Sequence, residues 1–243
     1  MQEQESARII EFEEKYSGKA LLEGMGMKLD FLPWDIREPQ PMLVALEEAG
    51  GFGAKVLDAG CGLGENAAYL ASRGHSVTAF DSSTSAIELA AERARARGAD
   101  VTFTVAEVTG LDVLEPGFDT VLDWGTLHSL PEQVRRPYVA GLHRLAKPGG
   151  VWQLFCFTES TAASLPMKWL RISHESLRAT LDGLWHIASI EDSTSTTTLT
   201  HDIVERQRQA AGVPDAAFDH GDLDVDQRGR ILMPISHLRL ERV

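Results

Sequence analysis

Apolar and polar residues follow two different patterns along the chain. Between residues 42 and 158, short apolar runs predict buried strands, and segments with apolar residues every three or four positions predict helices. The expected strands are 55–60, 76–81, 101–107, 118–125 and 151–158. The expected helices are 42–50, 65–74, 84–98 and 131–146, and a turn is expected at 147–150. This alternation predicts a parallel sheet covered by helices on both faces.

The two ends of the chain follow other patterns. Residues 2–24 have helical periodicity, and a loop rich in proline and aromatic residues follows at 30–41. The elements expected after residue 158 are a helix at 174–181, strands at 185–199 and 230–243, and a polar loop at 201–227. Two late strands of this kind suit an antiparallel pair at the edge of the sheet.

Composition narrows the classes of function. The 243 residues carry a formal net charge of −13, which argues against a nucleic-acid partner because phosphate binding relies on clustered Lys and Arg. Cys61 and Cys156 match no zinc spacing, so we expect no metal site and a reducing compartment. The acidic N-terminus does not resemble a signal peptide, and no apolar run is long enough to cross a membrane. We therefore expect a soluble, cytoplasmic protein with no membrane partner.

The segment VLDAGCGLGEN, residues 56–66, points to a nucleotide-like ligand. A predicted strand runs into a turn with glycines at 60, 62 and 64, and a predicted helix follows. Glycines let the backbone approach a ligand, and a helix N-terminus presents free amides. Asp81 ends the next predicted strand, where a carboxylate can accept hydrogen bonds from both hydroxyls of a ribose.

Charge around this turn distinguishes between nucleotides. A dinucleotide fingerprint would need glycine at position 65, which is Glu65. Asp58, just before the turn, would repel a pyrophosphate but suits a ligand with a cationic amino-acid tail. The electrostatics favour S-adenosylmethionine over NAD, although Asp58 serving only as a cap of the turn is the alternative. Cys61 fits a small filler of the turn better than a nucleophile, because no base or cation lies next to it in the sequence.

Five segments in a fixed order carry a family resemblance. They are VLDAGCGLG (56–64), VTAFDSS (77–83), AEVTGLD (106–112), FDTVLDWGTLHSL (118–130) and LAKPGGVWQLF (145–155). As a set they resemble the motifs of class I S-adenosylmethionine-dependent methyltransferases. The resemblance implies a Rossmann-like doubly wound α/β sheet, mostly parallel with an antiparallel C-terminal hairpin, and helices on both faces.

The resemblance also implies a cofactor site for S-adenosylmethionine. It places Asp81 on the ribose and Glu107 and Val108 beside the adenine, and it assigns the methionine moiety to the backbone around Asp58, Gly60 and Gly62. Glu107 stands where the family usually has Asp, and a solvated loop acid is the alternative. The remaining residues expected at the cofactor are Trp34, Ser82 and Asp123.

The segment PWDIREPQP, residues 33–41, resembles the pre-core segment of bacterial small-molecule methyltransferases, including enzymes for heterocyclic toxins, thiols, halides and thiopurines. There it covers the cofactor. Residues 1–41 are therefore expected to form an N-terminal helix and a covering loop, and 42–243 the methyltransferase domain. Trp34 either packs on the cofactor, walls the acceptor pocket or anchors the loop. Asp35 is expected to hold the loop through backbone amides, and Arg37 stands where relatives often have Gly.

His128 is the candidate catalytic base, since it follows the strand 118–125 at the edge of the sheet where ligands bind. A histidine that only packs or hydrogen-bonds is the alternative. His128 and Trp124 are expected to contact the acceptor, and the aromatic residues expected around it are Trp124, Phe155, Phe157 and Trp169. The segment 201–227 is either a solvated loop or an insertion that closes over the acceptor.

Three functions remain open on the sequence. The first is methyl transfer to O, N or S of a small aromatic or heterocyclic acceptor. The second is methylation of a macromolecule, which the acidic charge and the DWGT sequence at 123–126 disfavour. The third is a module that binds the cofactor without catalysis, since a fold alone never proves activity.

Overall fold

The computed structural model describes residues 21–22, 27–28, 31–159, 161, 171–210, 212 and 222–243. The helix expected at 2–24 lies outside these residues except at its end. There the prediction is wrong, because Leu21–Leu22 forms strand β1, paired antiparallel with β2 (Met27–Lys28).

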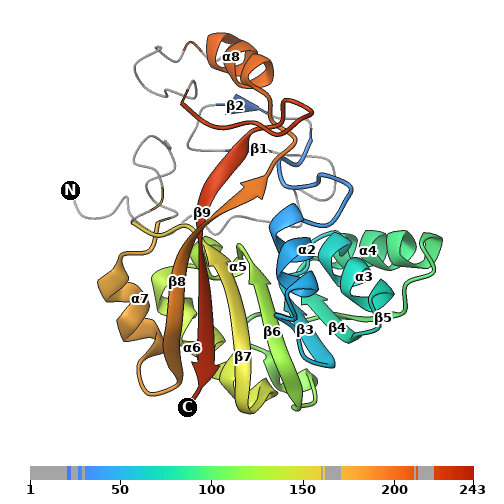
Figure 1. The fold of residues 1–243 in the computed structure, drawn as a ribbon, viewed down its shortest axis with the longest axis vertical. Coiled ribbons are helices and arrows are strands. Elements are labelled where there is room, and N and C mark those ends of the chain that lie inside the picture. Colours follow the sequence, from blue (N-terminus) through green and yellow to red (C-terminus); the bar gives the residue numbers. More distant parts are fainter. Residues whose placement is uncertain are drawn as a thin grey trace.

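A sheet of seven strands forms the centre of the molecule (Figure 1). Its order is β5 (Val101–Val105), β4 (Ser76–Asp81), β3 (Lys55–Ala59), β6 (Phe118–Trp124), β7 (Ala146–Cys156), β9 (Leu232–Arg242) and β8 (Trp185–Thr196). The first five strands are parallel, and β9 pairs antiparallel with both β7 and β8. The predicted parallel sheet with an antiparallel C-terminal hairpin is confirmed.

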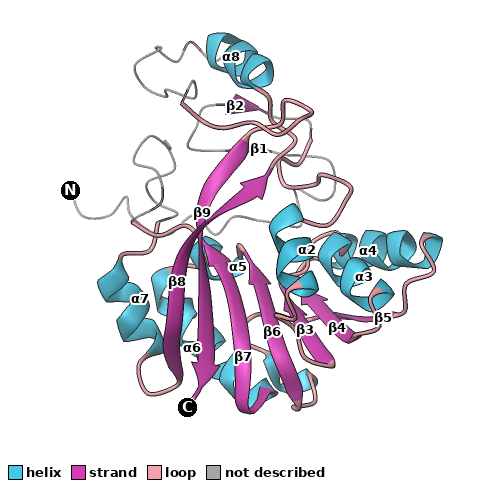
Figure 2. Ribbon diagram, in the orientation of Figure 1, coloured by secondary structure: helices cyan, strands magenta, loops and turns pink. Residues whose placement is uncertain are grey.

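Helices cover both faces of the sheet (Figure 2). One face carries α2 (Pro41–Glu48), α3 (Glu65–Ser72) and α4 (Thr84–Ala96), and the other carries α5 (Thr126–Ser129), α6 (Glu132–Leu145) and α7 (His174–Leu181). Successive residues of β3 serve the two faces: Val56 packs in the core with α2 and α3, and Leu57 in the core with α6 and α7. This follows from the two-residue period of a strand, and it explains why the strand reads as a continuous apolar run.

Three sequence predictions need correction. The segment 201–227 was expected to be a loop, but it begins with the helix α8 (His201–Ala210), whose only buried residue is Val204. A helix with so narrow an apolar stripe gives little periodic signal. The KPGG turn at 147–150 lies within β7, where the pairing with β6 shifts between Phe118 and Thr120. The short α5 and the 3-10 turn at Leu111–Val113 were not expected.

The C-terminal end of β8 and the N-terminal end of β9 stay paired with each other beyond the end of β7 and extend towards α8 (Figure 1). Beside them, residues 222–231 form a turn in which Val225 and Ile231 pair antiparallel. A third, smaller apolar cluster lies here, apart from the two cores that pack against the sheet. The carboxyl ends of the parallel strands are therefore roofed by segments from late in the chain.

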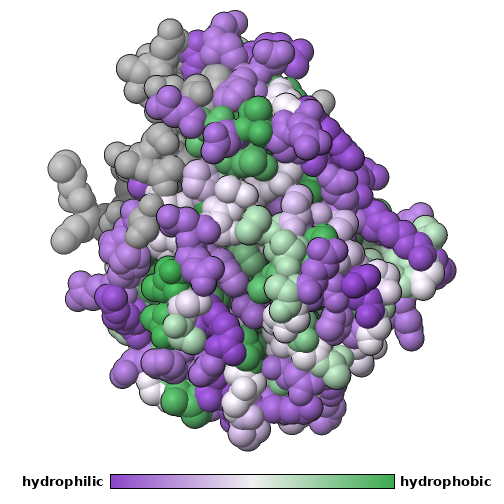
Figure 3. All heavy atoms as spheres, viewed as in Figure 1, coloured by the Kyte–Doolittle hydropathy of each residue, from purple (hydrophilic) through white to green (hydrophobic). Residues whose placement is uncertain are grey.

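Hydrophilic residues cover most of the face shown in Figure 3. Within the part of the chain that the structure describes, no helix combines the length and apolar character that a bilayer crossing requires.

Candidate active site

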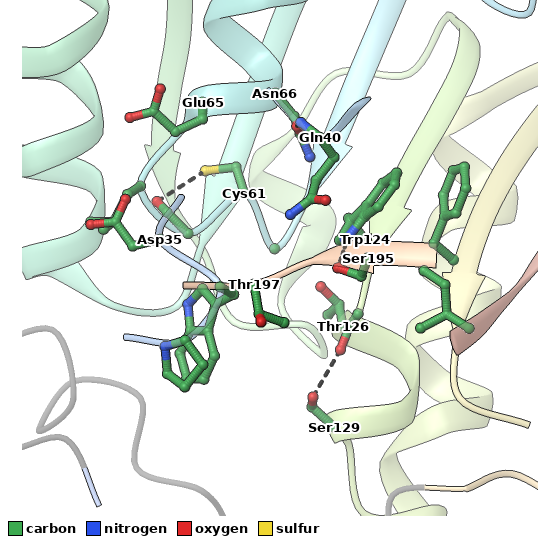
Figure 4. A pocket seen from close by; sticks show the side chains of 18 of the residues that line it. Asp35, Gln40, Cys61, Glu65, Asn66, Trp124, Thr126, Ser129, Ser195 and Thr197 are labelled. Atoms are coloured by element: carbon green, nitrogen blue, oxygen red, sulfur yellow. Dashed lines mark hydrogen bonds between the residues drawn. The ribbon is translucent and has the colours of Figure 1, made fainter. Parts of the chain in front are cut away.

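A cavity of about 320 Å³ lies at the carboxyl ends of β3, β4 and β6, where ligands bind in open α/β sheets. Its walls come from the glycine turn after β3, the ends of β4 and β6, residues 33–40, the end of β8, and the roof formed by α8 and residues 223–235. In Figure 4, Asp35 and Glu65 lie on one side, Trp124 and Ser195 on the opposite side, and Cys61 between them.

The glycine turn is held tightly against the neighbouring strands. The amides of Gly60 and Cys61 both donate to the carbonyl of Phe80 on β4, at 2.8 and 2.9 Å. Gly60 has φ +74, and a Cβ there would lie 2.0 Å from the hydroxyl oxygen of Thr126. Gly62 and Gly64 also have positive φ. The close approach and the left-handed backbone explain why glycine is needed at this turn.

Asp58 brings a buried carboxylate to this turn. Its Oδ2 has no hydrogen-bond partner among the described residues, although it lines the cavity. Burial raises the pKa of Asp58 to about 7, and the charges of Asp123 and Asp81 add to this effect. A buried carboxylate oxygen left unpaired favours a cationic partner from the cavity, since an uncompensated buried charge is costly.

Asp81 stands at the end of β4 with its carboxylate fixed by backbone amides. Its Oδ2 accepts from the Gly62 amide at 2.9 Å and its Oδ1 from the Ser83 amide at 3.0 Å. Burial raises the pKa of Asp81 while these amides lower it. The two carboxylate oxygens have four lone pairs between them, so Asp81 can still accept from a ligand, and it lines the cavity together with Ser82 and Val108.

Asp123 is buried behind the wall of the cavity and does not line it. Its carboxylate accepts from the amides of Thr126 and Leu127, at 2.7 and 3.2 Å, and from the Tyr138 hydroxyl at 2.9 Å. Burial raises the pKa of Asp123 to about 7. The residue therefore fixes the start of α5, the helix that carries His128, rather than reaching a ligand.

Residues 31–40, here called the covering segment, are tied to α4 by Arg93 and to its C-cap by Arg97, which donates to the Arg37 carbonyl at 3.1 Å. Arg93 donates to both carboxylate oxygens of Asp35, at 2.8 and 2.9 Å, and to Glu65 at 3.0 Å. The sequence prediction that Asp35 binds backbone amides is therefore wrong. Arg37 lies in the left-handed region, at φ 61, a backbone conformation that glycine adopts with less strain.

The other end of the covering segment is tied to β8. The amide side chain of Gln40 donates to the carbonyl of Thr196 at 3.0 Å and accepts from its N–H at 2.9 Å, as a neighbouring strand would. The Gln40 backbone N–H donates to Asn66, at 3.0 Å. The amide of Thr198 donates to the carbonyl of Pro33 at 2.8 Å. The segment is thus pinned to both sides of the cavity.

His128 faces the cavity as a neutral ring. The backbone N–H of Phe157 donates to its Nδ1 at 3.3 Å, and the two rings pack with centroids 4.6 Å apart. Burial lowers the pKa of His128 to about 3, and the charge of Arg135 acts in the same direction. Because Nδ1 accepts a hydrogen bond, the single proton of the neutral ring is on Nε2. The Nε2–H of His128 is therefore available as a hydrogen-bond donor, and the catalytic-base role stays a prediction.

Aromatic residues form the wall next to His128. Trp124 stacks on Phe155 with ring centroids 3.9 Å apart, and its Nε1–H donates to the Ser195 hydroxyl at 3.1 Å. Phe157 also lines the cavity, whereas Trp169 lies outside the described residues. The charged residues that line the described part of the cavity are all acids: Asp35, Glu38, Asp58, Glu65 and Asp81. Arginines pair with Asp35, Glu38 and Glu65, which leaves Asp58 and Asp81 uncompensated.

Comparison with known proteins identifies the chain. Residues 56–150 match the family model described as a methyltransferase domain. A solved structure titled as the conversion of a disulfide bond into a thioacetal group during echinomycin biosynthesis is 30% identical, with a TM-score of 0.73, and the match covers 95% of this chain and 90% of that one. The chain is a class I S-adenosylmethionine-dependent methyltransferase.

Two further relatives extend the comparison. A protein of Mycobacteroides abscessus named 2-heptyl-1-hydroxyquinolin-4(1H)-one methyltransferase is 38% identical to this methyltransferase over 129 residues, which are 53% of this chain and 57% of that protein. The match thus spans little more than half of the length of that curated relative. Magnesium protoporphyrin IX methyltransferase from Synechocystis, solved with the cofactor bound, is 20% identical with a TM-score of 0.53, covers 83% of this chain and 76% of that one, and supports the fold alone.

The cofactor of this methyltransferase is S-adenosylmethionine, and the cavity has the groups that such a ligand needs. Most of the residues predicted from the sequence line the cavity: Trp34, Asp58, Gly60, Gly62, Asp81, Ser82, Val108, Trp124 and His128. Asp123 and Glu107 do not, and Glu107 is exposed to solvent. The unpaired Oδ2 of Asp58 fits the cationic amino-acid tail, and the fixed Asp81 carboxylate fits a diol.

Sequence reasoning missed the residues that hold the site together. Arg93 and Ser195 belong to no motif, and Gln40 was given no role although it lies in the segment 33–41. Each of the three acts through a partner far along the chain. Thr126 lies within the fourth motif but was given no role, although its hydroxyl donates to the carbonyl of Ala59 at 2.8 Å.

Proposed function

We propose that this methyltransferase transfers a methyl group to O, N or S of a small aromatic or heterocyclic acceptor. The observation that carries the proposal is the polarity of the cavity. Four of its five acids lie at the end that holds the glycine turn, and the fifth, Glu38, is paired with Arg230 of the roof. The wall from Trp124 and Phe155 to the roof carries no other charge. A cofactor with a sulfonium and an ammonium group suits the first end, and a flat acceptor without positive charge suits the second.

At the acidic end, Asp58 accepts a hydrogen bond from the ammonium group of the cofactor and Asp81 accepts from the ribose hydroxyls. The Gly60 and Gly62 backbone lies along the methionine moiety, and Val108 packs against the adenine. Trp34, in the covering segment, packs on the cofactor from the opposite side. Because Glu107 is exposed, and because the Asp123 carboxylate is engaged inside the protein, we assign neither of them a direct contact.

At the neutral end, His128 donates its Nε2–H to the acceptor. S-adenosylmethionine supplies a methyl group on a sulfonium that is already activated for displacement. The protein then needs to bind the acceptor with a free lone pair on its nucleophilic atom, align that atom with the methyl group and exclude water. A hydrogen-bond donor with a pKa near 3 does not remove a proton at neutral pH, so the acceptor reacts in a form that is ionised in solution or uncharged with a free lone pair.

The relatives support this proposal. One is named for a hydroxyquinolone that carries a heptyl chain, and the other was solved for the conversion of a disulfide in echinomycin biosynthesis. The net charge of −13 disfavours a nucleic-acid acceptor.

The test is methyl transfer from isotopically labelled S-adenosylmethionine to pooled acceptors, read by mass spectrometry. The pools are hydroxy-heterocycles and phenols, thiols, amines, halides, tRNA and peptides. We expect label in a small-molecule pool, and less label with the Asp58→Asn enzyme at a limiting cofactor concentration. Label confined to tRNA or peptides would replace the proposal by a macromolecular methyltransferase. Cofactor binding without label in any pool would support a non-catalytic binding module.

A further inference from the structure

We infer that the roof of the cavity binds an aliphatic tail of the acceptor, so that the acceptor is amphipathic: a flat head that is methylated and an apolar substituent. This inference rests on the proposed function. The part of the cavity concerned is here called the tail chamber, and its residues are Leu199, Val204, Leu223, Ile231 and Met233.

The tail chamber is apolar throughout. Its five side chains come from α8, β9 and the loops before and after α8, and all of them line the cavity. They are at most 7% exposed, and they form a cluster separate from the two cores that pack on the sheet. An apolar cluster that faces a ligand cavity, and that the sheet does not need, favours an apolar part of a ligand.

The walls of the tail chamber are fixed by backbone hydrogen bonds. The amide of Ile231 donates to the carbonyl of Leu199 at 2.8 Å, and the amide of Leu232 donates to Asp224 at 2.8 Å. Near the rim, Arg230 binds both Asp226 and Glu38, each at 2.7 Å. The chamber is thus held in place before a ligand arrives, and its charged neighbours are paired with one another.

Phe157 connects the tail chamber to the place of the acceptor head. Its side chain packs against the apolar cluster of the chamber, its ring contacts the His128 ring, and its amide fixes His128 Nδ1. A molecule with its nucleophile at His128 Nε2 therefore has Phe157 beside its head and the tail chamber beyond it. Met233 adds a flexible side chain that adapts to the end of a tail.

The length of the alkyl substituent on the acceptor tests directly whether the tail chamber binds it. Each methylene that leaves water for an apolar site improves binding by about fourfold, until the site is full. The probes are 1-hydroxyquinolin-4(1H)-ones with 2-alkyl substituents from methyl to nonyl, the head group named for the Mycobacteroides abscessus relative. Their dissociation constants are measured by calorimetry with S-adenosylhomocysteine bound, and their kcat/KM values are measured separately.

Substitutions locate the effect. Val204→Phe fills the chamber and is expected to reduce the heptyl-to-methyl affinity ratio at least tenfold, by removing the site of two or more methylenes. Arg206→Phe places the same bulk on the exposed face of α8 and is the matched control. Met233→Ala enlarges the chamber and is expected to move the best chain length upwards, which keeps the test valid if Val204→Phe does not fold.

The outcomes separate the two proposals. Affinity that rises with chain length and falls selectively in Val204→Phe supports the tail chamber, whether or not methyl transfer occurs. If the longer probes then bind but no member is methylated, the tail chamber stands and methylation of such heterocycles is contradicted. Equal affinity for all members, or an equal effect of Val204→Phe and Arg206→Phe, overturns the inference even if the methyl head is methylated.

Discussion

At the scale of single residues, the cofactor end of the cavity depends on a carboxylate that the free protein leaves unpaired. Asp58 has an oxygen without a partner among the described residues, and burial raises its pKa to about 7. A cationic ligand binds the ionised form better. The carboxylate thus costs the ligand-free protein stability and favours the bound state, as is common where a site is built for a charged ligand.

This predicts a pH dependence of cofactor binding. Affinity for S-adenosylhomocysteine, which keeps the ammonium group, should rise as Asp58 ionises between about pH 6 and about pH 8. Asp58→Asn should weaken binding by about tenfold or more at the higher pH and remove this dependence. Calorimetric titration at both pH values measures it. A wild-type dissociation constant that does not change with pH would contradict the role of Asp58.

The same substitution has an opposite effect on stability. The folded-state pKa of Asp58 is raised above its unfolded value, so its contribution to stability is present at low pH and is lost as pH rises from about 4 to about 7. Asp58→Asn should therefore raise the free energy of unfolding of the ligand-free protein near pH 8. Urea unfolding measures this, and a stability loss in Asp58→Asn would show that the carboxylate is structural.

Alanine substitutions at Gly60 and Gly74 distinguish the cost of backbone strain from the cost of a steric clash. Both have positive φ, but a Cβ at Gly60 would lie 2.0 Å from the Thr126 hydroxyl, and a Cβ at Gly74 would have no atom within 4 Å. Gly74→Ala should cost about 1 kcal/mol in the free energy of unfolding, and Gly60→Ala about 3 kcal/mol or more. Equal costs in denaturant unfolding would mean that the turn is less tightly packed than described.

The pH profile of kcat/KM and substitutions of His128 test whether the enzyme uses this residue as a general base. A ring with a pKa near 3 gives no inflection between about pH 6 and about pH 7 in kcat/KM, so the profile should follow the ionisation of the acceptor. His128→Gln keeps an N–H donor and should retain more kcat than His128→Ala, with KM changing less than kcat. An inflection that belongs to the enzyme and disappears in His128→Gln would restore the general-base interpretation.

At the scale of elements, the covering segment forms one wall of the cavity and is held there by side chains. Asp35 is joined to α4 by a bidentate pair with Arg93, and Glu65 at the start of α3 shares the same arginine. The other end is joined to β8 through Gln40. Residues 31–40 form no helix or strand, so these side-chain contacts hold the segment in position at the cavity.

Arg93→Met should therefore weaken cofactor binding by about fivefold or more, because Asp35 loses the partner that ties it to α4 and keeps only the exposed Arg37. Arg93→Lys should restore only part of it, since lysine cannot make the bidentate contact. Arg95→Met, on the exposed side of the same helix, is the matched control. Calorimetry with S-adenosylhomocysteine measures all three, and equal affinity of Arg93→Met and Arg95→Met would contradict the anchoring role.

At the scale of the whole molecule, the sequence determines the sheet and its ligand-binding edge more clearly than the roof. Continuous apolar strands, glycine stops and the acid before the glycine turn are local signals, so the parallel core and the place of Asp58 follow from them. The Gln40–Thr196 pair joins positions 156 apart, and α8 buries a single valine. Such contacts depend on tertiary packing, which no local pattern carries.

The charge of His128 was unpredictable for the same reason. A histidine near a strand end suggests a base, but the burial of its ring and the amide of Phe157 favour a neutral ring with its proton on Nε2. These groups reach the ring only in the folded protein. Asp123 was expected at the cofactor, but its carboxylate instead accepts hydrogen bonds from the start of α5 and from Tyr138. These partners are also brought to it only by the packing of the folded protein.

The most direct test of the account is a single turnover with ¹³C-methyl-labelled S-adenosylmethionine, excess enzyme and 2-heptyl-1-hydroxyquinolin-4(1H)-one, the compound named for the Mycobacteroides abscessus relative. Mass spectrometry and carbon NMR of the product identify the atom that carries the label. We expect one labelled methyl group on a heteroatom of the ring system and one equivalent of S-adenosylhomocysteine. Bound cofactor that stays intact in the presence of this acceptor and of the other small-molecule pools would contradict it.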